Sequence, residues 1–245
     1  MSVLPDRTPD IAEYGAERNG QRQKLDRRVF MQLVAIESTG KLGVAEIQRG
    51  LAGSLESRNA GAVIYEDLHH PGGLGILGFS EDPLDLVTRL RPAVGDHAAG
   101  LRIRPEMGML GRTYSTGFED DLEYWLLRRP VETVLNGQWN WAVWYPLRRT
   151  PSFERLDPKE KGSILREHAV VGRSYGEANL AHDVRLACHG LDTNDNDFVI
   201  GLVGQDLNPL SRVVQAMRRT RQTSEYLASL GPFFVGRAVW RHSPQ

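Results

Sequence analysis

Residues 75–91 read GILGFSEDPLDLVTRLR and residues 199–218 read VIGLVGQDLNPLSRVVQAMR, and the likeness of these two stretches decides the fold. Each runs from an apolar segment typical of a β-strand, through a short acidic turn and a proline, into a segment with amphipathic helical spacing. Self-similarity of this kind indicates a duplicated supersecondary unit. We therefore interpret the chain as an internal repeat of a β-α-β-β-α-β unit.

The segments around these two stretches follow the same order in each half. In the first half we expect strands at residues 28–36, 62–68, 74–79 and 107–115, and helices at 44–55 and 83–90. In the second half we expect strands at residues 139–147, 184–189, 198–204 and 233–240, and helices at 157–168 and 209–217. A helical segment at residues 121–136 would connect the two halves.

The repeat predicts an α+β fold in which two sheets share one core. A four-stranded antiparallel sheet with helices on one side leaves its other face apolar, and packing two such faces together buries both. We assign residues 26–136 to the first half and residues 137–245 to the second. The first 25 residues are polar and unpatterned, and we expect them to form a flexible N-terminal arm.

Composition narrows the class of protein. The chain has 245 residues, of which 40% are hydrophobic and 25% charged, so it can bury a sizeable core. Its formal net charge of −1 gives no reason to expect nucleic acid or an anionic membrane as a partner. A single cysteine excludes an intrachain disulfide framework and a Cys-rich zinc site. Because there is no run of eighteen or more apolar residues and no basic-then-apolar leader, we expect a soluble cytoplasmic protein.

The common catalytic motifs are missing from the sequence. There is no Gly-rich phosphate loop of the right spacing, no HExxH, no GxSxG and no CxxC. Residues 192–197, DTNDND, alternate carboxylates with polar residues but lack the glycine and closing glutamate of an EF-hand. We expect this segment to be a solvated hairpin turn.

One of the seven histidines stands out by its setting. On the helix expected at residues 157–168, Ile164 and Leu165 should face inward, and His168 follows Ile164 by four residues on the same stripe. An imidazole at the inner end of an apolar stripe can bind one axial position of a haem iron without other protein ligands. The same pattern also fits a structural histidine at a helix end, and more often marks one.

Four motifs in the second half resemble the chlorite dismutase family, which includes the bacterial coproheme decarboxylases. They are WYPLRR at residues 144–149, REHAVVGRSYG at 166–176, GLD at 190–192 followed by Phe198, and GPFFVG at 231–236. Together they span about a hundred residues in family order. The resemblance implies two ferredoxin-like halves packed as a dimeric α+β barrel within one chain. It also implies a ring-shaped homo-oligomer, often a pentamer, with one haem per subunit in the C-terminal half.

The resemblance also suggests roles for individual residues. His168 matches the family's proximal iron ligand, and Arg148 or Arg149 could pair with a haem propionate. Phe153 is the nearest match to the family's pocket aromatic residue, and Arg185 to the distal arginine of the dismutases.

The chain also departs from the dismutase pattern. Val203 aligns with the strand glutamate that hydrogen-bonds the proximal histidine, and Ala181 stands at the usual spacing of the distal arginine. Tyr114 is the candidate for the tyrosine that coproheme decarboxylases use on the last strand of the first half.

Three hypotheses follow from this resemblance. The first is a haem-binding oxidoreductase that carries out peroxidase-type chemistry with haem b and a small oxidant such as peroxide. The second is a peroxide-dependent coproheme decarboxylase in haem biosynthesis, in which the porphyrin is the substrate and Tyr114 forms the radical. The third is a haem carrier or haem-free binding module on the same fold.

Overall fold

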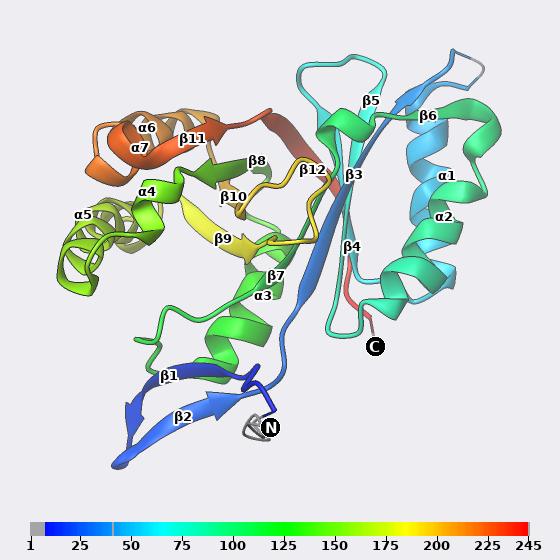
Figure 1. Cartoon of the computed structure of the whole chain (residues 1–245). Coiled ribbons are helices and arrows are strands. Elements are labelled where there is room, and N and C mark those ends of the chain that lie inside the picture. Colours follow the sequence, from blue (N-terminus) through cyan, green and yellow to red (C-terminus); the bar gives the residue numbers. More distant parts are fainter. Residues whose placement is uncertain (1–7, 41, 245) are drawn as a thin grey trace, which may run out of the picture.

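Eight strands close into an antiparallel barrel in the computed structural model, which describes residues 8–40 and 42–244 (Figure 1). The strands of the first half are β3 (Phe30–Ser38), β4 (Ala62–Asp67), β5 (Gly73–Ser80) and β7 (Met109–Thr113). Those of the second half are β8 (Trp141–Arg149), β9 (His182–Ala187), β10 (Phe198–Gly204) and β12 (Phe234–His242). Around the barrel the order is β10-β9-β7-β3-β5-β4-β12-β8, and β8 pairs back with β10.

Each half has the strand order of a ferredoxin-like unit. In the first half the order is β7-β3-β5-β4, and in the second it is β12-β8-β10-β9, so the fourth strand always lies beside the first. The halves join along two seams. The seam between β4 and β12 is long, whereas that between β7 and β9 pairs only Arg112 with Ala187 and Thr113 with Leu186. The predicted duplication and the dimeric α+β barrel are confirmed.

Helices cover the outside of the barrel on two opposite sides (Figure 1). The first half carries α1 (Val44–Ser57), the π-helical turn η1 (Leu86–Leu90) and α2 (Arg91–Gly95). The second half carries α4 (Pro151–Glu154), α5 (Pro158–Glu177), α6 (Leu207–Met217) and α7 (Arg221–Tyr226). The predicted connecting helix consists of η4 (Tyr124–Arg128) and α3 (Arg129–Leu135). The shorter elements η2 (Ala98–Gly100), β6 (Leu101–Ile103), η3 (Pro105–Met107) and β11 (Leu227–Leu230) complete the chain. None of the helices in the described ranges is long and apolar enough to cross a membrane.

Aromatic side chains fill the barrel, and two glycines make room for them. Trp144 and Phe234 are fully buried in the interior. A Cβ on Gly75 would lie 2.4 Å from Cζ of Phe234, and one on Gly201 would lie 2.5 Å from the Trp144 ring. These glycines stand on β5 and β10, the third strand of each half. The repeat therefore extends to the packing of the core.

The N-terminal segment differs from the expected flexible arm. Residues 13–25 form a hairpin of β1 (Glu13–Arg18) and β2 (Gln21–Leu25), joined by Asn19 and Gly20 with positive φ. An Asn-Gly pair favours this type of two-residue hairpin turn, and we missed that signal in the sequence.

Hydrogen bonds tie this hairpin to the barrel. The amide of Ala16 donates to the Glu119 carbonyl at 2.9 Å, and Arg112 pairs with Glu13 at 2.7 Å. The prediction of an arm is therefore wrong for residues 13–25. Residues 1–7 of the predicted arm lie outside the described residues.

Candidate functional site

Helix α5 lies over the outer face of the second-half sheet and carries His168 (Figure 1). Its N-terminus is capped by Asp157, whose carboxylate accepts from the amides of Lys159 and Glu160 at 3.0 Å each. We expected the helix to end at His168, but it continues to Glu177. A Cβ on Gly172 would lie 3.3 Å from Cε of Met217, so this glycine permits close packing against α6 instead of ending the helix.

His168 lies on the inner side of α5, as its spacing from Ile164 predicts. Ile164 is buried, and His168 is half-buried. Leu165, expected to face inward, is 36% exposed because it stands at the flank of the buried stripe. Nδ1 of His168 lies 3.0 Å from the hydroxyl of Thr220.

The surroundings of His168 keep its imidazole neutral. Burial, together with the positive charges of Arg149 and Arg185, lowers its pKa to about 4. At neutral pH the ring is therefore uncharged, and the neutral imidazole is the form that binds a metal. Within the described residues, no three His, Cys, Asp or Glu side chains are grouped to hold a metal ion. A lone histidine suits a metal that brings its other ligands with it, as the iron of a haem does.

Strand β8 directs Arg149, and not Arg148, toward this site. Alternate residues of the strand face opposite sides of the sheet, and Tyr145 and Leu147 pack on the helix side with Arg149 on the same face. Arg148 faces the other way and lies 3.5 Å from Asp195 in the acidic turn. Of the two predicted propionate-binding arginines, the structure brings only Arg149 close to His168.

Arg149 lies between aromatic rings and forms no ion pair with the described residues, although the charges of Glu154 and Asp197 act on it. Its guanidinium lies over the rings of Phe153 and Phe198, at 4.5 and 4.6 Å from their centroids. Nε of Arg149 is buried and makes no hydrogen bond to the described residues, and none of the ion pairs there involves this side chain. Burial lowers the pKa of the Arg149 guanidinium. Such a desolvated charge favours the binding of an anionic group.

Phe153 supports Arg149 and does not line an open space. It stands on α4, is fully buried, and contacts the ring of Tyr226 edge-on at 5.5 Å. No part of its surface is accessible, and a contact of Phe153 with a cofactor stays a prediction.

Strand β9 contributes Asp183 and Arg185 to the same side of the sheet. Nε of Arg185 lies 3.0 Å from Asp183, and the carboxylate and carbonyl of Asp183 also accept from Arg129 at 2.7 and 2.8 Å. Burial alone would raise the pKa of Asp183, but the two arginines lower it overall. Asp183 thus holds Arg185 in place, while both side chains keep more than a third of their surface exposed.

Tyr114 follows β7 directly and joins this group. Thr113 pairs with Leu186, which places Tyr114 beside Arg185 at the β7–β9 seam. Its ring packs against Phe198 at 5.3 Å, and burial raises the pKa of its phenol. The register of this strand, open in the sequence, therefore places the tyrosine on the helix side of the sheet.

Two polar contacts of this site were not predicted from the sequence. Thr220, next to His168, is 52 positions further along the chain, and no pattern in the sequence marked it. Asp183 stands two residues before Arg185, the spacing of side chains on one face of a strand, and that signal could have been used. Val203 is buried in the barrel interior and does not contact His168.

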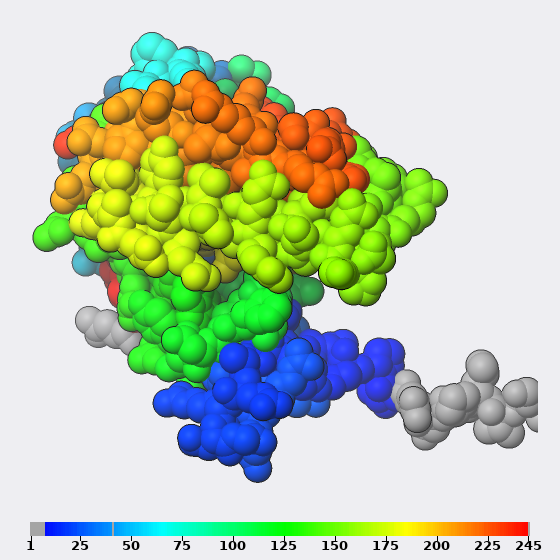
Figure 2. Space-filling model, turned by 90° about the vertical axis from the view of Figure 1, so that its left-hand side faces the viewer, coloured from blue at the N-terminus to red at the C-terminus, as the bar shows by residue number. Residues whose placement is uncertain are grey.

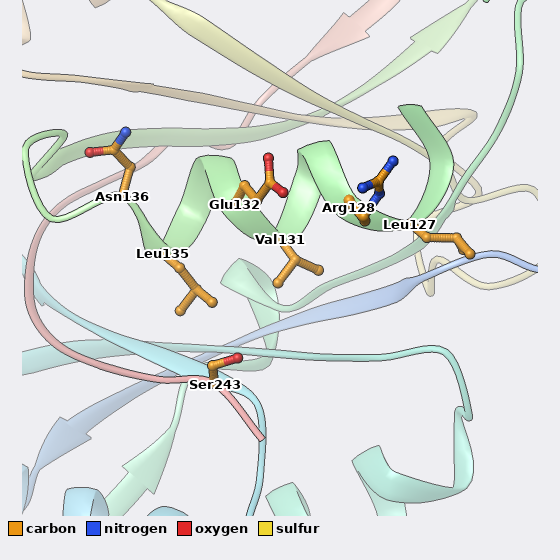
Figure 3. A pocket seen from close by; sticks show the side chains of 7 residues that line it. All are labelled: Leu127, Arg128, Val131, Glu132, Leu135, Asn136 and Ser243. Carbon is orange, nitrogen blue, oxygen red and sulfur yellow. The ribbon is translucent and has the colours of Figure 1, made fainter. Parts of the chain in front are cut away.

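A separate cavity of about 490 Å³ lies along the connecting helix (Figure 3). It is lined by Leu127, Arg128, Val131, Glu132, Leu135, Asn136 and Ser243. Leu127, Val131 and Leu135 follow one side of the helix, and Figure 3 shows Val131 and Leu135 directed toward the C-terminal segment. No residue of the His168 group lines this cavity, and it lacks that group's concentration of charge. The candidate functional site is therefore the face of the sheet under α5. Figure 2 shows this side of the molecule from outside, with α6 and α7 above α5.

One known protein family matches the C-terminal part of the chain. The sequence pattern of the family described as chlorite dismutase matches residues 113–239, which is more than half of the chain. The chain belongs to the chlorite dismutase family. The matched segment includes Tyr114, Arg149, His168, Arg185 and Thr220.

Solved structures of other proteins share the fold at low sequence identity. A haem-binding protein from Thermus thermophilus is 18% identical, with 87% of this chain and 92% of that chain covered and a TM-score of 0.68. A variant of chlorite dismutase from Candidatus Nitrospira defluvii is 16% identical, with 88% and 93% covered and a TM-score of 0.69. Another variant of that enzyme, in complex with cyanide, is 16% identical, with 88% and 92% covered and a TM-score of 0.66. No curated protein matches the chain.

Proposed function

We propose that this protein is a haem-binding oxidoreductase in which Nε2 of His168 is the axial ligand of the iron. The observation that carries this proposal is a neutral imidazole whose Nδ1 is already hydrogen-bonded, close to a half-buried arginine that forms no ion pair with the described residues. A haem offers both missing components, an iron with four ligands of its own and carboxylate groups for Arg149.

The other residues of the site support peroxidase-type chemistry. A bound haem would supply the redox-active iron that reacts with a small oxidant such as peroxide. Arg185, held by Asp183, would stabilise negative charge that develops on an oxygen atom of the oxidant. We further propose haem b as the cofactor, because Arg149 forms no ion pair with the described residues and Asp183 partly neutralises Arg185.

Tyr114 favours a second candidate, peroxide-dependent decarboxylation of coproheme. Its phenol lies beside Arg185 and within the electrostatic reach of Arg149. In this case the porphyrin would be the substrate, and Tyr114 would be the residue that is oxidised. Coproheme carries four carboxylates, which the charges of this site match less well than the two of haem b.

Titration of the metal-free protein with haem tests the first proposal. We expect a haem absorption band to appear in the wild type. Loss of a residue that only supports a metal ligand lowers metal affinity by up to roughly 100-fold, so His168→Ala, which removes the ligand itself, should lower haem affinity by more than that. His69→Ala, in an exposed turn of the first half, is the matched control and should bind as the wild type does. If the wild type binds no haem, a haem-free binding module remains. Equal binding by His168→Ala would reject the axial ligand.

Incubation with coproheme and peroxide separates the two candidates. Decarboxylation would remove two carboxyl groups as carbon dioxide, which mass spectrometry of the porphyrin detects, and Tyr114→Phe would abolish the loss. An unchanged porphyrin mass, with oxidation of an added peroxidase substrate, supports the first candidate. We also propose a homo-oligomer, a pentamer by family resemblance, which native mass spectrometry would test.

A further inference from the structure

Thr220 connects the segment between α6 and α7 to His168 on α5. It is 3% exposed and directly precedes α7. Its carbonyl accepts hydrogen bonds from the amides of Thr223 and Ser224 at 3.1 and 2.9 Å, and from the Ser224 hydroxyl at 3.0 Å. The backbone of Thr220 is therefore fixed, and its hydroxyl has a defined position relative to α5.

The hydrogen bonds of the Thr220 hydroxyl indicate which ring nitrogen of His168 carries the proton. The Thr220 hydroxyl lies 2.8 Å from the Met217 carbonyl and 3.0 Å from Nδ1 of His168. A carbonyl oxygen only accepts, so the single hydroxyl proton points to Met217, and its oxygen accepts from Nδ1–H. The third neighbour, the Thr223 hydroxyl at 3.5 Å, is too distant to compete. Nε2 is then the unprotonated nitrogen, and in the described part of the chain it has no hydrogen-bond partner.

We propose that Thr220 is a positioning residue that keeps His168 protonated on Nδ1, so that Nε2 stays free to bind iron. The inference rests on the proposed haem function and extends it. An acceptor on Nδ1 fixes both the tautomer and the orientation of a metal-binding imidazole. Because a hydroxyl is a neutral acceptor, it leaves the ligand an ordinary imidazole, whereas a carboxylate would draw the Nδ1 proton away and increase negative charge on the ring.

Besides its bond to His168, the Thr220 hydroxyl donates to the Met217 carbonyl, which also accepts from the Thr220 amide at 3.0 Å and so keeps a donor when the hydroxyl is removed. Although Thr220 stands at the N-cap position of α7, its hydroxyl makes no hydrogen bond to the amides of that helix. Replacement by valine keeps the shape and removes only the hydroxyl, and replacement by serine keeps the hydroxyl. The pair Thr220→Val and Thr220→Ser therefore tests the hydroxyl, and the His168 ring reports its bond to Nδ1.

Nitrogen-15 NMR of the histidine rings in the metal-free, full-length protein tests the inference directly. We expect His168 of the wild type and of Thr220→Ser to carry its proton on Nδ1. In Thr220→Val we expect a shift toward the Nε2–H form, which predominates in free imidazole side chains. A wild-type ring protonated on Nε2, or a ring unchanged by Thr220→Val, would overturn the inference. Thr220→Ala is a second hydroxyl-free variant if the valine form does not fold.

Haem affinity and the ferric–ferrous midpoint potential provide the second measurement. Thr220→Val should weaken haem binding by about 10- to 100-fold and move the potential, whereas Thr220→Ser should match the wild type in both. If Thr220→Val changes neither the haem affinity nor the midpoint potential, Thr220 does not position the ligand. If the wild type binds no haem, the proposed function fails, while the NMR result still decides whether Thr220 sets the tautomer.

Discussion

The two halves of the barrel share one topology but differ in what lies between sheet and helices. Under α1 and α2 of the first half the space is filled by buried aliphatic side chains: Ile47, Leu51, Leu55, Ile64, Ile76, Leu86 and Leu90. Under α5 of the second half the sheet presents Arg149, Asp183 and Arg185, with Tyr114 at the seam and His168 above them. Apolar packing there is concentrated toward α6, around Leu210 and Val213.

This difference shows that the two halves of a duplicated fold can serve different purposes, one stabilising the barrel and the other presenting polar groups. The first half contributes a closed, apolar layer that stabilises the barrel. The second half leaves polar groups half-exposed under one helix, where their charges are only partly matched by the protein itself. A site built in this way sacrifices some stability in one half, because desolvated charges are costly without a partner.

A substitution in the buried layer of the first half should have the largest effect on stability. Leu51→Ala removes a fully buried side chain on α1 and should lower the free energy of unfolding by about 2–5 kcal/mol. Urea unfolding followed by circular dichroism measures this change. Haem affinity of the folded protein should stay at the wild-type value, and a parallel loss of haem binding would argue against separate tasks for the halves.

In the second half, loss of the half-buried charge of Arg149 should lower haem affinity without lowering the free energy of unfolding. Arg149→Met removes an unpaired guanidinium, so the free energy of unfolding should stay unchanged or rise, whereas haem affinity should fall by about 10- to 100-fold as one charge-assisted hydrogen bond is lost. Arg148→Met makes the same chemical change one residue earlier, on the opposite face of β8. That control should leave haem affinity unaltered, and equal effects of the two substitutions would contradict the assignment of Arg149.

The dependence of the unfolding free energy on pH should also distinguish the second half, which contains His168, from the first. The folded-state pKa of His168, about 4, lies below its ordinary value of 6.5, so protons bind the unfolded chain preferentially. The contribution of His168 is therefore complete above pH 6.5, and about 3 kcal/mol is lost as the pH falls from 6.5 to 4.

The variant His168→Gln has no titratable side chain at this position, so its free energy of unfolding cannot show this loss. The difference in unfolding free energy between wild type and His168→Gln, measured in urea across this pH range, should change by that amount. Parallel curves would show that the imidazole is not held neutral by its surroundings.

Periodicity and repetition were sufficient to predict the repeated unit, whereas the closed barrel was implied by the resemblance to the family. The likeness of residues 75–91 to 199–218 led to the β-α-β-β-α-β repeat because strand and helix periods depend on neighbouring residues. The hairpin at residues 13–25 was missed because its strands are polar and exposed, and only the Asn19-Gly20 turn marks it.

The site could be predicted only in part, since it depends on contacts between distant segments. His168 was found from its spacing to Ile164 and from the family motifs. The choice between Arg148 and Arg149 required the register of β8, because neighbouring residues of a strand face opposite sides. Thr220 was missed because no pattern in one sequence joins residues 52 positions apart.

A crystal structure of the protein with bound haem tests the central claim most directly. We predict the porphyrin between α5 and strands β8 and β9, with the iron on Nε2 of His168, Nδ1 still bonded to Thr220, and a propionate against Arg149. Haem in the cavity along α3, or iron bound by another histidine, would contradict the account.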